Sequence, residues 1–219
     1  MKNGGVATRP GAATSSLKER QRAERAALIL DAAQQIFAAK GYHAAAIEEI
    51  ASRVGISKGA VYLHYASKEA LLEAIFARQI TWFIAMVDDV AASATSVRAR
   101  LEQILAWVYD RLGGEYGPLV LELSALGLPV GAIDQRPALQ VQAVRATERL
   151  ATLIGEGQRA GELDPAIPTP VLVTTFSGLL SSPGFAQLLA SGQYAPAELV
   201  GHVSRTFFVG AAPPAPRDR

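Results

Sequence analysis

Apolar residues recur at helical spacing in the stretch AIEEIASRVGIS. Ile47, Ile50, Ala51 and Val54 fall on one face of a helix, so this face is expected to pack inward. Gly55 follows at once, and glycine ends a helix readily because it adopts the left-handed conformation without a Cβ clash. The pattern predicts a short helix that stops in a tight turn.

A second helix is predicted immediately after this turn, over residues 58–65. Ser57 precedes it and is a good N-cap, because its hydroxyl can accept a hydrogen bond from an unpaired backbone N–H of the first turn. Val61 and Tyr65 are spaced to hold the helix against the protein. Helix, glycine-containing turn and helix form a helix-turn-helix pattern, whose second helix enters the major groove of DNA.

The second helix also carries residue types that suit contact with DNA. Lys58 is a cation, and Gly59 and Ala60 are small enough to let the backbone approach closely. Tyr62 and His64 follow as hydrogen-bonding side chains. An ordinary corner between two helices, with solvated lysines, would explain each residue alone. The ordered set favours nucleic-acid binding.

A third helix is predicted to begin after Ser67, another N-cap, and to run to about Ala92, because neither Gly nor Pro interrupts it. Lys68 lies in its first turn, where exposed N–H groups attract phosphate. Further helices are expected at 23–40, 96–112, 116–126, 137–160, 170–190 and 196–209. No stretch shows sustained strand alternation, so the predicted fold class is all-α.

Charge is distributed unevenly along the 219 residues. Residues 1–70 hold ten Lys/Arg and six Asp/Glu, a net +4, while the remainder holds eleven and fourteen, a net −3. This asymmetry fits a basic end that faces nucleic acid. Residues 1–22 lack the apolar core of a secretory signal and are expected to be a flexible basic arm.

Residues 165–197 contain no charged residue, which raises the possibility of a membrane span. Pro183 and Gly184 interrupt the segment, however, hydroxyl side chains dilute it, and no basic cluster flanks it. A helix buried inside the protein is therefore expected, with no membrane partner.

Several functional classes are excluded by what the sequence lacks. There is no cysteine, so disulfides and thiolate metal sites are absent and a reducing cytoplasm is expected. The three histidines, His43, His64 and His202, do not have metal-ligand spacing, and no nucleophile or phosphate-loop motif occurs. The chain is expected not to be an enzyme and to need no cofactor and no metal.

Residues 24–76 resemble the DNA-binding part of tetracycline-repressor-like (TetR-family) regulators, through ERAALILDAAQQIFAAKGYHAAAIEEIA and ISKGAVYLHYASKEALL. The resemblance implies phosphate contacts from Tyr62 and Lys68. It implies base or groove contacts from Lys58, Gly59, Ala60 and His64, with Glu48 as a weaker candidate. Ala46 stands where the family often has a capping threonine, which puts one backbone contact in doubt.

The resemblance further implies a helical ligand-binding and dimerisation domain over 71–210, after a helix-turn-helix DNA-binding domain over 23–70 and before a flexible tail, 211–219. An apolar effector pocket is expected among Trp82, Phe83, Met86, Trp107, Tyr109, Asp110, Tyr116, Glu122, Arg145 and Phe176. A homodimer interface is expected from Leu172, Phe176, Leu179, Leu180, Leu199, Val203 and Phe207.

The function expected from these features is that of a ligand-responsive DNA-binding transcriptional regulator. It would act as a repressor that binds a palindromic double-stranded operator as a homodimer and is released by a small hydrophobic or amphipathic effector. The alternative is a dimeric, helical small-molecule-binding protein that has lost DNA binding.

Overall fold

A computed structural model describes residues 17–114, 116–125 and 137–210, apart from the side chains of 122–125 and 137–139. Every regular element in these ranges is a helix, which confirms the all-α prediction. The first five helices are α1 Leu17–Lys40, α2 Ile47–Val54, α3 Lys58–Tyr62, α4 Lys68–Ala91 and α5 Val97–Gly113. The others are α6 Gly117–Ala125, α7 Pro137–Arg159, α8 Thr169–Ser181, α9 Pro183–Ala190 and α10 Pro196–Gly210.

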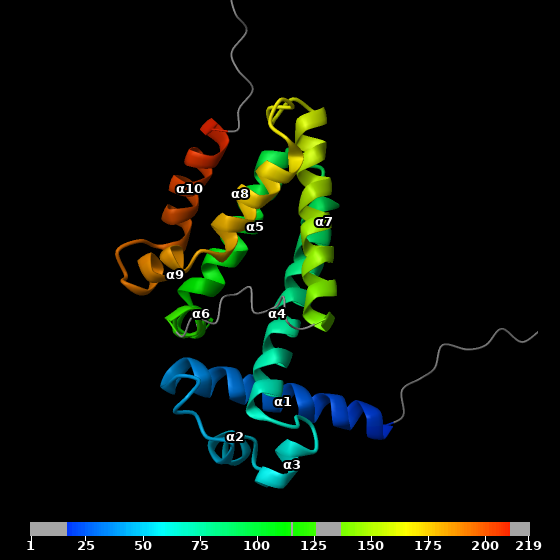
Figure 1. Cartoon of the computed structure of the whole chain (residues 1–219), viewed down its shortest axis with the longest axis vertical. Helices are drawn as coiled ribbons and strands as arrows, with labels where there is room; N and C mark the ends of the chain where they lie inside the picture. The colour runs from blue at the N-terminus through cyan, green and yellow to red at the C-terminus, as the bar shows by residue number, and fades with distance from the viewer. Residues whose placement is uncertain (1–16, 115, 126–136, 211–219) are drawn as a thin grey trace, which may run out of the picture.

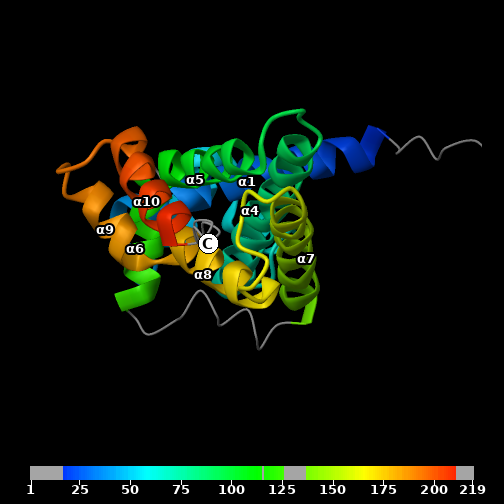
Figure 2. The same cartoon turned by 90° about the horizontal axis from the view of Figure 1, so that it is seen from above.

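The helices form two groups that are joined by α4 (Figure 1). Helices α1, α2 and α3 lie together at one end, and α4 runs from them into the second group. In that group, α5 and α8 lie in the middle, with α9 and α10 on one side and α7 and the upper part of α4 on the other, as the view from above also shows (Figure 2). The arrangement places one long helix in both halves of the molecule.

Each group has its own hydrophobic core. The N-terminal core is the cluster of buried side chains around Ile29, Phe37, Ile50, Val61 and Ile75. The C-terminal core is the cluster around Leu101, Leu105, Tyr109, Leu153 and Phe176. Burial of this much apolar surface is the main force that holds each group together.

Helix α6 connects the two cores. Leu119 is fully buried in the N-terminal core, although it belongs to a helix of the second group, while its neighbour Val120 is buried in the C-terminal core. Tyr116, just before α6, packs against both clusters. The two groups therefore share packed side chains as well as the α4 backbone.

The caps predicted around the turn are present. Gly55 adopts the left-handed conformation, with φ of 73°. The hydroxyls of Ser57 and Ser67 each accept a hydrogen bond from the backbone N–H three residues later, at 3.1 Å. Ala46 gives α2 no side-chain cap. The order of helix, turn and helix is thus fixed by local chemistry that the sequence already contains.

Three predicted helices differ from the structure by more than two residues at one end or by a division. Helix α1 begins at Leu17, so residues 17–22 of the predicted arm form its first turns. The rest of that arm, 1–16, and the predicted tail, 211–219, lie outside the described residues. Helix α3 ends at Tyr62, three residues before the predicted end. The helix predicted over 170–190 is divided into α8 and α9, because Pro183 cannot donate a backbone hydrogen bond and begins a new helix at its first position.

Helix α4 is the one described helix that is long and apolar enough to cross a membrane by composition. Its apolar residues have other partners, since Leu71 and Ile75 are buried in the N-terminal core and Val87 in the C-terminal core. The length and apolar character of α4 are explained by its contribution of buried side chains to both hydrophobic cores.

Most residues predicted for a dimer interface are buried within the single chain. Leu172, Phe176, Leu199, Val203 and Phe207 retain at most 6 % exposure, and the rings of Phe176 and Phe207 stack edge to face with centroids 5.3 Å apart. Leu179 and Leu180 are only partly buried, against the same core. The five buried side chains hold α8 and α10 onto their own subunit, so a partner would meet other faces of these helices.

We expect Leu119→Ala to lower the free energy of unfolding by about 2–5 kcal/mol, because it leaves a cavity in the N-terminal core. Urea denaturation followed by circular dichroism measures this loss. Val144→Ala, at an exposed position of α7, should change the free energy by less than about 0.5 kcal/mol. A loss below about 1 kcal/mol for Leu119→Ala would show that α6 is not anchored there.

Candidate functional site

The turn and its caps place α3 on the surface with one face free. Val61 is fully buried and anchors the helix, whereas the Tyr62 side chain next to it is 42 % exposed. The Tyr65 hydroxyl donates a hydrogen bond to the Ala26 carbonyl of α1 at 3.2 Å, which secures the segment after α3. Gly59 is exposed, with ample space around its Cα. The small residue and the aromatic side chain thus lie on an open, firmly held surface.

Lys58 and Glu48 face each other across the turn. The Lys58 ammonium donates to the Glu48 carboxylate at 2.5 Å and lies 5.9 Å from the centre of the Tyr62 ring. The hydrogen bond from Lys58 lowers the pKa of Glu48, and the same contact raises the pKa of Lys58. Two predicted contact residues are therefore paired with each other in the free protein, so a nucleic acid would compete with Glu48 for this lysine.

Lys68 is held against the segment between α1 and α2. Its ammonium lies 4.7 Å from the centre of the Tyr42 ring and donates a hydrogen bond to the His43 carbonyl at 3.1 Å. Tyr42 in turn donates to Glu69, the next residue of α4, at 3.2 Å. These contacts fix a cation beside the start of α4, where the backbone N–H groups of the first turn favour an anion.

His64 lies in a basic hollow whose other lining residues are not among the predicted DNA-contact residues. The hollow has a volume of about 490 Å³ and is lined by Lys18, Arg22, Arg25 and Leu63 in addition to His64. Partial burial lowers the pKa of His64, and the charges of Arg22 and Arg25 lower it further. Arg22 and Arg25 are three residues apart, a spacing that places two side chains on one face of a helix. The sequence indicates this shared basic face only if α1 is known to extend back to Leu17.

A second cavity, of about 310 Å³, lies among α4, α5, α6, α7 and α8. Its lining includes three of the predicted pocket residues: Phe83, Trp107 and Tyr116. Most of the wall is apolar, and its hydroxyl groups come from Tyr116, from Thr147 and from serines in and just after the second half of α8. The pocket is at the lower end of the size range of small-molecule sites, which is about 300–1,000 Å³.

The other predicted pocket residues lie elsewhere. Tyr109 and Phe176 fill the C-terminal core, and the Tyr109 hydroxyl donates to the Leu179 carbonyl at 3.1 Å. Asp110 and Arg145 are exposed, and Arg145 lines a separate hollow. Met86 packs partly buried against the core and Trp82 is 42 % exposed, while the Glu122 side chain lies outside those described. Large aromatic side chains in this domain mostly fill the core, as their burial would favour in any helical protein.

Arg111 and Gln79 are pocket residues that the sequence analysis did not single out. The Arg111 guanidinium donates to the Gln79 side-chain oxygen at 2.5 Å and lies 5.0 and 4.8 Å from the ring centres of Trp82 and Trp107. Burial lowers the pKa of Arg111. Two features of the sequence indicate these residues. Gln79 is a polar residue on the apolar stripe of α4, and the spacing of four residues between Trp107 and Arg111 places both on one face of α5.

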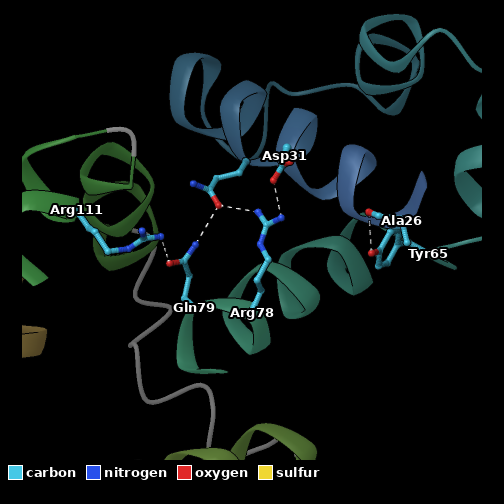
Figure 3. A network of polar contacts seen from close by, with 7 residues as sticks. Ala26, Asp31, Tyr65, Arg78, Gln79 and Arg111 are labelled. Carbon is cyan, nitrogen blue, oxygen red and sulfur yellow. Dashed lines mark hydrogen bonds and ion pairs between the residues drawn. The ribbon is translucent and has the colours of Figure 1, made fainter. Parts of the chain in front are cut away.

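A chain of hydrogen bonds leads from this pocket to α1 (Figure 3). The Gln79 side-chain nitrogen donates to the Gln34 side-chain oxygen at 3.1 Å, and Arg78 donates to the same oxygen at 3.0 Å. Arg78 also donates to Asp31 at 2.6 Å. Arg111 of α5, two residues of α4 and two of α1 thus form one polar network between the helical groups.

The family model of bacterial regulatory proteins, tetR family, matches residues 29–75. The HTH-type transcriptional regulator UidR of Escherichia coli is 30% identical over 141 residues, which are 64% of this chain and 70% of UidR. The A-factor receptor protein of Streptomyces griseus is 30% identical over 180 residues, 80% of this chain and 58% of that protein.

Among solved structures, the transcriptional regulator FadR from Bacillus subtilis in complex with stearoyl-CoA shares this fold with a TM-score of 0.70. It is 22% identical, and the match covers 84% of this chain and 98% of that one. Together with the helix-turn-helix surface and the helical second group, these similarities identify the family. The chain belongs to the TetR family of bacterial transcriptional regulators.

Proposed function

We propose that this protein is a cytoplasmic, ligand-responsive repressor that binds a palindromic operator as a homodimer and releases it when a small apolar or amphipathic molecule fills the pocket. The observation that carries the proposal is that one helix serves both sites. Leu71 and Ile75 of α4 are buried beneath the helix-turn-helix, and Gln79, Ile80 and Phe83 of the same helix line the pocket. A ligand that displaces this wall acts directly on the support of α3.

DNA binding would use the free face of α3. Lys58, Gly59 and Tyr62 lie on that face, and the basic hollow beside His64 gives a second place for a phosphate. In a dimer of this kind, the two copies of α3 enter major grooves one helical turn apart, about 34–36 Å between half-site centres. Because Lys58 must leave the Glu48 carboxylate to contact DNA, it would favour operator sequences whose base edges offer it a better hydrogen-bond acceptor than that carboxylate.

Coupling between the sites would pass through α4 and α6. Val120 lines the pocket, and its neighbour Leu119 is buried in the N-terminal core. Movement of α6 would therefore change the packing of α1. The ligand needs only to bind one arrangement of the helices better than the other, by about 1–3 kcal/mol. The names of the A-factor receptor and of the stearoyl-CoA complex of FadR support a ligand-responsive role.

Dimerisation would use the outer faces of α8 and α10. On α8, Val171, Thr175 and Gly178 form an exposed and uncharged strip. On α10, Arg205 and Val209 are exposed on the side opposite the buried phenylalanines. Small and β-branched residues let two helices approach closely, and a two-fold axis would bring the strip of each subunit against that of its copy.

Selection from a random pool of duplex DNA at near-physiological salt tests the proposal. We expect one palindrome to be enriched, and a Tyr62→Ala/Lys68→Ala double variant to lose affinity for it, because both phosphate contacts are removed. Fluorescence anisotropy on the selected duplex measures the loss. A folded dimer that enriches no sequence would instead support the alternative, a ligand-binding protein without DNA binding, which the missing cap at Ala46 also favours.

We expect Lys58→Ala to change the preferred base at one position of each half-site, by about 1–3 kcal/mol, because the lysine reads a base edge. Competition between single-base variants of the operator measures the change. Lys40→Ala is a matched control, since Lys40 also pairs with a glutamate of α2, Glu49, at 2.5 Å. The role of Lys58 in base reading is wrong if both variants keep the wild-type preference.

We expect Gly178→Arg to weaken the dimer at least about tenfold, or about 1.4 kcal/mol, because it places an unpaired charge in the interface. Apart from the backbone of its own helix, a Cβ at Gly178 or at Gly155 of α7 would have no atom within 4 Å, so the first atom of either side chain meets no clash. Sedimentation velocity on Gly178→Arg, with Gly155→Arg as the control, measures the effect. Equal dimer affinities for the two variants would rule out this face.

A further inference from the structure

We propose that the effector is an apolar molecule with a single carboxylate and that Arg111 binds this carboxylate. The inference rests on the proposed function, because it names the chemical class of the ligand for the same pocket. Among the described residues that line the cavity, Arg111 is the one that carries a charge. The rest of the wall offers aliphatic and aromatic side chains, hydroxyls and the Gln79 amide.

Arg111 has an unused capacity to bind an anion. Its described partners are an amide oxygen and two indole rings, with no carboxylate among them. A guanidinium carries five N–H donors in a planar fork that matches a carboxylate, and one of these donors is engaged by Gln79. The two indole rings hold the fork in place, so a ligand would meet a preorganised site.

The charges around Arg111 make an anion more favourable than a neutral group. Arg78, the nearest cation of the network, is already paired with Asp31. No ion pair joins Arg111 to a described carboxylate, and the exposed Asp110 carboxylate acts on its charge only at longer range. Burial is the larger influence, and it lowers the pKa of Arg111. A ligand carboxylate would supply a countercharge in direct contact, in a setting of reduced dielectric where charge-assisted hydrogen bonds are strongest.

Binding at Arg111 would also reach the DNA-binding group. A carboxylate on Arg111 competes with the Gln79 side-chain oxygen, and Gln79 donates to Gln34 of α1 through its nitrogen. Release of Gln79 from Arg111 lets the amide turn and loosens the contact between α4 and α1 (Figure 3). The same arginine would therefore bind the ligand and transmit the effect of binding to the contact between α4 and α1.

The test compares three compounds with the same ten-carbon chain: decanoate, decan-1-ol and decylamine, all below micelle-forming concentration. The full chain is titrated without DNA and followed by tryptophan fluorescence. The protein has two tryptophans, and both lie against Arg111, so the signal reports on this site. We expect decanoate to bind about 10- to 100-fold more tightly than decan-1-ol, and decylamine to bind most weakly.

Arg111→Gln should reduce the affinity for decanoate to that for decan-1-ol, while the affinity for decan-1-ol itself changes little. Arg98→Gln is the matched control, because Arg98 is on the same helix and lies 4.9 Å from the ring centre of Phe208, outside the pocket. Circular dichroism verifies that both variants are folded. Binding of none of the three compounds, equal binding of all three, or an unchanged preference in Arg111→Gln would overturn the inference. Failure to select an operator would count against the proposed function instead, since this titration contains no DNA.

Discussion

The continuity of α4 is the constraint on which the other parts of this structure depend. Its first turns complete the core under the helix-turn-helix through Leu71 and Ile75, and its middle forms one wall of the pocket. A helix is stiff along its axis because each turn is hydrogen-bonded to the next, so the two ends cannot move independently. Packing of Leu119 into the N-terminal core adds a second connection. The domain boundary is therefore a packed joint and not a flexible linker.

The polar network at this joint has a different role from the cores. Buried apolar contacts are tolerant of small shifts, whereas hydrogen bonds among Arg111, Gln79, Gln34 and Arg78 require particular geometries. Because few arrangements of these side chains satisfy all the hydrogen bonds, the network can favour one relative position of the two helical groups over another. On the outer surface, the pair of Lys58 and Glu48 is exposed and contributes little to stability, so it can be exchanged for contacts with DNA at low cost.

Similarity to known regulators extends over the fold, but the chemistry of the pocket belongs to this chain. Solved structures with 22% identity share the arrangement of helices. The charged group of the cavity and its network depend on a few side chains that this level of similarity does not carry over. The same holds for the outer faces of α8 and α10, where α8 exposes uncharged residues and α10 exposes a basic residue and a valine.

The sequence by itself determined the all-α class, the helix-turn-helix with its glycine turn and two serine caps, and the family. These features depend on residues close together in the chain, where spacing and backbone preference decide the outcome. Only the tertiary structure decided which apolar side chains of α8 and α10 are buried, which aromatic residues line the cavity, and that Arg111 meets Gln79. Periodicity identifies an apolar face but not its partner, so the sequence predicts an interface for Phe176 and Phe207, which in the structure pack against each other. Contacts between residues 32 and more positions apart, such as that of Arg111 with Gln79, arise from how the helices pack, and no local pattern encodes them.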